Sequence, residues 1–187
     1  MNLLHGTVVM SLQERDVVLD TLEETIPEIL TKCLLNPEIV LAACDALAKT
    51  IGEKHVGLLK EMGVPHKKAE GYVQEATYLL SRDHLAHRLE HELGVGWNGE
   101  SVLDGGNGTC VKERVFPLGT LLHITAGNQY GLAFYSVIEG LLTGNVNLVK
   151  LSSDDDGLSA LVFLELFKLE PRLAEYVFLF DYTSKDT

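Results

Sequence analysis

The sequence predicts an α/β fold: a partial doubly wound parallel sheet of Rossmann type, preceded by a helical N-terminal region. Two apolar runs, residues 118–125 and 146–151, have the length of buried strands. Between them, residues 132–142 carry apolar side chains at helical spacing. Strand, helix and strand of these lengths form a βαβ unit, which joins parallel strands. A third apolar run, residues 176–180, is expected to extend the sheet as a strand buried on both faces.

Residues 1–94 are expected to form a helical region. Ser11 and Glu14 have capping-box spacing, which predicts a helix to about residue 24, and Pro27 then opens a second helix. Asn36-Pro37-Glu38 combines an N-cap, a proline in the first turn and an acid beside it, which predicts a third helix. The remaining segments expected to be helical are residues 56–62 and 65–93, with a break at 81–83.

Composition changes after Gly94. Residues 95–114 are rich in turn residues and predict a hairpin around Gly105-Gly106-Asn107-Gly108. Residues 115–187 are expected to form the βαβαβ nucleotide-binding core. Its second helix should begin within residues 152–156, where hydroxyls and acids favour a first turn, and should end before Pro171.

Two polar side chains follow the predicted strands of the βαβ unit. Asn128 comes just after the first strand, and Lys150 stands near the end of the second. Open α/β sheets bind ligands outside the carboxyl ends of their strands. The sequence therefore brings an amide and an ammonium group to one edge of the sheet.

The segments PLGTLLHITAGN and LLTGNVNLVKLSS, with GLSALVFLELFKLEPRLAEYVFLFDYTSKD after them, resemble a known family. They are similar to the long-chain acyl-CoA reductases, the fatty acid reductase subunit of bacterial luminescence, within the aldehyde dehydrogenase superfamily. The resemblance runs from about residue 116 to 187 and is looser over residues 1–110. It implies an aldehyde dehydrogenase-like fold and the reduction of an acyl-CoA or acyl thioester to an aldehyde.

The same resemblance implies roles for individual residues. Asn128 would donate its amide to the oxyanion of the substrate, and Thr125, Lys150, Ser152 and Ser153 would bind the cofactor. Many NAD-dependent aldehyde dehydrogenases have Glu at the position of Ser153, so Ser153 implies NADP(H). The family's catalytic Cys, acid/base Glu and glycine motif lie beyond residue 187. We therefore expect this chain to be the N-terminal part of a longer enzyme, inactive without its catalytic domain and a homo-oligomer when complete.

Composition limits the class of partner. The chain has 187 residues, with 27 Asp and Glu against 15 Lys and Arg, giving a net charge of −12. This balance disfavours nucleic acid as a partner. No apolar run is long enough to span a membrane and no secretory signal opens the chain, so a cytoplasmic location is expected. Three cysteines without CxxC spacing predict neither disulfides nor a zinc ribbon.

Several patterns have simpler interpretations. The sequence GVGWNG from Gly94 matches G-x-G-x-x-G but lacks a preceding strand and a following helix. Cys110 is not expected to be a nucleophile, and Cys33 and Cys44 are expected in the core. His84, His87 and His91 are interpreted as a solvated helical face, His123 as a satisfied core residue, and Asp154–Asp156 as helix N-terminal charge, so no metal is expected.

Two other hypotheses stay open on the sequence alone. The chain could be a non-catalytic nucleotide-binding or CoA-binding module, or an assembly subunit. It could also be a metal-binding helical protein, through the histidines of residues 84–91.

Overall fold

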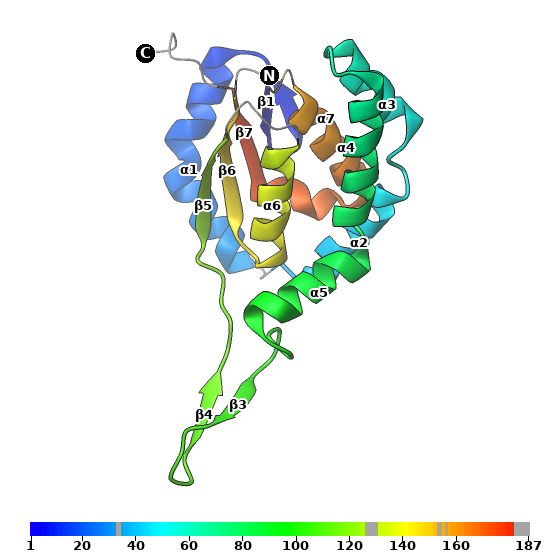
Figure 1. Ribbon diagram of the computed structural model, residues 1–187. Helices are drawn as coiled ribbons and strands as arrows, with labels where there is room; N and C mark the ends of the chain where they lie inside the picture. Colours follow the sequence, from blue (N-terminus) through cyan, green and yellow to red (C-terminus); the bar gives the residue numbers. More distant parts are fainter. Residues whose placement is uncertain (33–34, 126–130, 153–154, 156, 182–187) are drawn as a thin grey trace.

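The computed structural model describes residues 1–32, 35–125, 131–152, 155 and 157–181 (Figure 1). A five-stranded sheet forms its centre, in the order β2-β1-β7-β6-β5. The strands of this sheet are β1 (Asn2–Leu4), β2 (Thr7–Val9), β5 (Thr120–Ile124), β6 (Val146–Lys150) and β7 (Val177–Phe180). β5, β6 and β7 are parallel, whereas β1 is antiparallel to both β7 and β2.

The predicted α/β fold with a partial parallel sheet is therefore confirmed, and β1 and β2 make the whole sheet mixed because they join it antiparallel. The chain begins with a β-hairpin rather than a helix, and this hairpin extends the sheet beyond β7. His5 and Gly6 form its two-residue turn with φ of 50° and 73°. Positive φ at both central residues belongs to the turn type that matches strand twist in tight hairpins.

Helices cover both faces of the sheet. α1 (Leu12–Lys32) contacts β1 and β6, and α6 (Leu132–Leu142) contacts β5 and β6. α7 (Leu158–Leu169) packs against α6 and leads through the 3₁₀ segment Pro171–Tyr176 into β7. In Figure 1, α1 lies on the opposite side of the sheet from α6. The predicted order β5, α6, β6, α7, β7 is confirmed.

Four more helices lie outside α6 and α7. They are α2 (Pro37–Ala48), α3 (Glu53–Glu61), α4 (His66–Leu79) and α5 (Arg82–Leu93). α2 packs against α5, α6 and α7. Its predicted cap is present, because the Asn36 side chain accepts a hydrogen bond from the Glu38 N–H at 2.9 Å. The break between α4 and α5 also falls where it was expected, with Ser81 as the N-cap of α5.

Two helix boundaries differ from the expectation. The two helices predicted around Pro27 are one helix, α1, with Pro27 inside it. Leu22 and Ile29 are both buried and lie seven residues apart on one face, so packing on either side of Pro27 offsets its missing N–H. α7 begins at Leu158 rather than within residues 152–156, because Gly157 adopts φ of 81° directly before it.

The predicted hairpin is present as β3 (Ser101–Asp104) and β4 (Cys110–Glu113), paired antiparallel. It extends away from the sheet and helices (Figure 1). Within the described part of the chain, no helix has the length and apolar character that a membrane span requires.

Candidate functional site

The carboxyl ends of β5 and β6 are joined through Thr125. Its N–H and its hydroxyl group both donate to the Lys150 carbonyl, at 3.2 and 3.1 Å. Its Oγ1 in turn accepts a hydrogen bond from the Ser152 N–H at 3.1 Å. Three of the residues proposed from sequence to bind cofactor are thus brought together, because a threonine ends one strand beside the end of the next.

Lys150 supplies the positive charge at this edge. It is half-buried and is the last residue of β6. Among the described residues, no carboxylate forms an ion pair with its ammonium group. The Leu151 N–H donates to the Phe180 carbonyl at 2.9 Å, which fixes this end of β6 to β7 as well. A lysine at the sheet edge that has no carboxylate partner in the described part of the chain suits an anionic ligand such as a nucleotide.

Asn128 and Ser153 lie outside the described residues. The structure instead fixes the residues on either side of each. Thr125 ends β5, and Gly131 precedes α6 in the left-handed conformation, with φ of 78°. Ser152 follows β6, and Asp155 comes after Ser153 and Asp154.

Asp155 caps α7. Its carboxylate accepts hydrogen bonds from the Ser159 N–H, at 3.2 Å, and from the Ser159 hydroxyl. Burial raises the pKa of Asp155 above its ordinary value, although these hydrogen bonds act in the opposite direction. The hydrogen bonds to Ser159 place this acid at the N-terminus of α7, as the sequence predicts for residue 155. Asp154 and Asp156 are outside the described ranges.

A partly buried polar network, missed in the sequence, lies beneath α6. His123 of β5 contacts the Ser136 hydroxyl through Nδ1, at 2.7 Å, and the Asn147 Oδ1 through Nε2, at 3.0 Å. The Asn147 amide nitrogen donates to the Asn145 carbonyl at 2.8 Å, so its oxygen must accept from His123 Nε2. His123 is therefore a satisfied residue, as expected, and Nδ1 is free to accept from Ser136. The network ties the strand before residues 126–130 to the helix that follows them.

The remaining candidates lie elsewhere. In the described ranges, no group of three or more His, Cys, Asp or Glu residues is arranged so that it could hold a metal ion. This holds for His84, His87 and His91 on α5 as well. The glycine-rich segment from Gly94 follows α5 and leads to β3 rather than to a helix. It therefore lacks the context of a phosphate loop.

The described cysteines differ in environment. Cys44 is buried in α2, and burial raises the pKa of its thiol to about 12. Cys110 is exposed on β4, in the projecting hairpin and away from the edge where Thr125 and Lys150 meet (Figure 1). Cys33 is among the residues that the structure does not describe.

Comparison with protein families shows which family the chain belongs to. The family model "Acyl-CoA reductase (LuxC)" matches residues 37–187, which is most of the chain. The chain belongs to the acyl-CoA reductase (LuxC) family. The resemblance seen in the sequence from about residue 116 is confirmed, and the match extends it back to α2.

Structural comparison relates this acyl-CoA reductase family member to the aldehyde dehydrogenase fold. It is similar to glyceraldehyde-3-phosphate dehydrogenase GapN from Methanocaldococcus jannaschii in complex with NADP, with a TM-score of 0.60 and 22% sequence identity. The superposition covers 96% of this chain and 38% of the GapN chain, so the chain spans well under half of that protein's length. Comparison with curated proteins gives no match.

Proposed function

We propose that this chain is the N-terminal, cofactor-binding part of an NADPH-dependent reductase that converts a long-chain acyl-CoA or acyl thioester to the aldehyde. The observation that carries the proposal is the edge formed by Thr125 and Lys150. There a half-buried ammonium group without an ion-pair partner among the described residues stands beside the strand that leads to Asn128. The family match and the NADP complex of the structural neighbour support it.

Each residue has a distinct part in this proposal. Lys150, Ser152 and Ser153 bind the adenosine end of NADP(H), and Thr125 holds the ends of the two strands together. NADPH supplies the hydride. Asn128 donates its side-chain amide to the thioester carbonyl oxygen as negative charge develops there, and a donor already held in place costs no reorganisation. A catalytic domain outside this chain supplies the nucleophilic Cys, and the complete enzyme acts as a homo-oligomer.

The test measures NADPH oxidation with tetradecanoyl-CoA by the complete enzyme and by its Asn128→Ala variant. Loss of one oxyanion donor is expected to lower kcat by about 10²–10³-fold. The Kd for NADPH should change little, because the amide contacts the substrate oxygen. A kcat that stays within about threefold of the parent, in a folded variant, would show that Asn128 only forms a turn.

The alternative is a non-catalytic nucleotide-binding or CoA-binding module. The observation in its favour is that the chain matches only 38% of the length of its structural neighbour GapN. It predicts binding of NADPH or CoA without aldehyde formation under any pairing with a catalytic domain. Aldehyde formation by the complete enzyme excludes it.

A further inference from the structure

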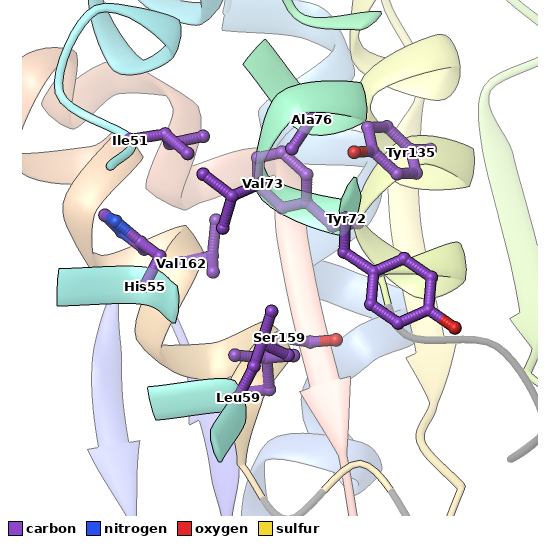
Figure 2. Close-up of a pocket in the computed structure, with 12 residues that line it drawn as sticks. Ile51, His55, Leu59, Tyr72, Val73, Ala76, Tyr135, Ser159 and Val162 are labelled. Carbon is purple, nitrogen blue, oxygen red and sulfur yellow. The ribbon is translucent and has the colours of Figure 1, made fainter. Parts of the chain in front are cut away.

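An apolar cavity separates the α3–α4 pair from α6 and α7 (Figure 2). Its volume is about 80 Å³, and it is open on one side. Residues of all four helices line it, together with Ile51, which lies in the connection between α2 and α3. Figure 2 labels Val73 and Ala76 of α4 and Val162 of α7 among the side chains that line it.

The cavity reaches the same edge of the sheet as the candidate site. Gly131 and Leu158 both line it. Gly131 is the N-cap of α6, which follows β5, and Leu158 is the first residue of α7, which follows β6. A ligand in this cavity therefore lies close to the starts of the two helices that follow the Thr125–Lys150 edge.

Two of the polar side chains that line the cavity, His55 and Ser159, already have hydrogen-bond partners. His55 accepts from the Gly52 N–H through Nδ1, at 3.2 Å, and contacts Glu165 through Nε2, at 2.9 Å. The Ser159 hydroxyl donates to Asp155. Burial, with a smaller effect of nearby Glu75, raises the pKa of Tyr135 to about 12. The surface left to a ligand is hydrocarbon, which suits an uncharged apolar group.

The wall formed by α3 and α4 is separate from the main core. Val56, Leu59, Val64 and Ala69 form their own hydrophobic cluster. Lys54 and His55 at the start of α3 pair with Glu165 of α7, which attaches this wall to the sheet-covering layer. The cavity therefore lies between this small cluster and the main core, and residues of both clusters line it.

We propose that this cavity receives the methyl-terminal carbons of the substrate's acyl chain, and that Ala76 and Val162 set the chain length that fits. The inference rests on the proposed function, which supplies an acyl substrate at the adjoining edge. The family match covers every residue that lines the cavity, since it begins at residue 37. A bulkier side chain at residue 76 shortens the cavity, and a smaller one at residue 162 lengthens it.

The first experiment uses the 187-residue chain and tetradecanoic acid as the probe, with calorimetry. Ala76→Trp should weaken binding at least about tenfold, or about 1.4 kcal/mol. Thr77→Trp is the matched control, because residue 77 is the next position on α4 and is exposed. Its Kd should stay within about twofold of the parent. Absence of binding to the parent chain, or equal loss in both variants, would overturn the proposal.

The second experiment uses the complete enzyme with acyl-CoA substrates of increasing length. Ala76→Trp should lower kcat/KM for tetradecanoyl-CoA at least about tenfold relative to butanoyl-CoA. Val162→Ala, which removes volume and keeps the helix, should shift the preferred chain to greater length even if the Trp variant fails to fold. An unchanged chain-length profile in both variants refutes the acyl site while the proposed function stands. A parent enzyme that reduces no acyl-CoA refutes the proposed function itself.

Discussion

Cofactor choice is expected to depend on the residue three positions after Lys150. A carboxylate there would oppose the 2′-phosphate of NADP, since two like charges 4 Å apart repel by about 1 kcal/mol in water and about 4 kcal/mol at an effective dielectric of 20. A serine at this position, Ser153, would remove that repulsion and offer a hydroxyl donor. The complete enzyme should favour NADPH over NADH by at least about tenfold in kcat/KM, and Ser153→Glu should erase the preference. Equal kcat/KM for both cofactors in the parent would show that Ser153 does not set the choice.

Thiol reactivity should follow the two environments that the structure gives Cys44 and Cys110. The thiolate is the reactive form, and burial of Cys44 raises its pKa to about 12, so its thiol stays protonated at neutral pH. Cys110 is exposed. In a titration of the folded chain with Ellman's reagent, Cys110→Ala should remove one fast-reacting thiol, and Cys44→Ala should leave the fast fraction unchanged. Rapid labelling of Cys44 in the folded state would contradict its assignment to the core.

The positions of candidate site residues could be predicted from the sequence when the residue stands at the end of a strand. Lys150 and Thr125 follow from two apolar runs of strand length, and the structure joins them by hydrogen bonds. The contacts of His123 with Ser136 and Asn147 were not predictable. They depend on the register of β5 against β6 and on the rotation of α6, neither of which a single sequence states.

Close packing of helix α6 on β6 requires a residue without a side chain at position 140. A Cβ atom on Gly140 would lie 1.9 Å from the Asn147 Oδ1, and Asn147 is fully buried. Gly140→Ala should therefore lower the free energy of unfolding by about 1–3 kcal/mol through overpacking. Gly71 of α4 is the matched control, because nothing lies within 4 Å of a Cβ there. Gly71→Ala should stabilise by about 0.5–1 kcal/mol.

Urea denaturation of both glycine variants provides the measurement, with the midpoint compared at constant slope. The opposite signs make the comparison independent of general effects of Gly→Ala substitution in helices. A neutral or stabilising Gly140→Ala variant would mean that α6 can move away from β6 without loss.

At the level of elements, the βαβαβ core was predictable, and the N-terminal hairpin was not. β5, α6 and β6 are long enough for their periodicity to show, and Gly144 with φ of 78° ends α6 as expected. β1 and β2 have three residues each, too few for an alternation pattern. The available signal was the dipeptide His5-Gly6, because glycine at the second position of a two-residue turn permits positive φ.

At the scale of the whole molecule, β5 is an edge strand of the five-stranded sheet. The Val146 N–H donates to the Gly119 carbonyl and the Thr125 N–H to the Lys150 carbonyl, so the odd-numbered residues of this strand pair with β6. In a parallel ladder the even-numbered residues then present their backbone groups to the free edge. Leu122 and Ile124 are among them, and their side chains are 68% and 76% exposed. Within the described residues, these two side chains on β5 therefore have no covering layer.

An uncovered apolar edge strand favours association between chains. We therefore expect the 187-residue chain to self-associate through β5 as its concentration rises. Leu122→Lys with Ile124→Lys should shift it towards monomer in sedimentation velocity, because charged side chains on an edge oppose strand pairing. Leu161→Lys is the control for added charge, since Leu161 is 43% exposed on α7, away from this edge. If the control dissociates the chain equally, net charge rather than the β5 edge governs association. If the parent stays monomeric at every concentration tested, the edge is protected in a way that the exposed side chains do not indicate.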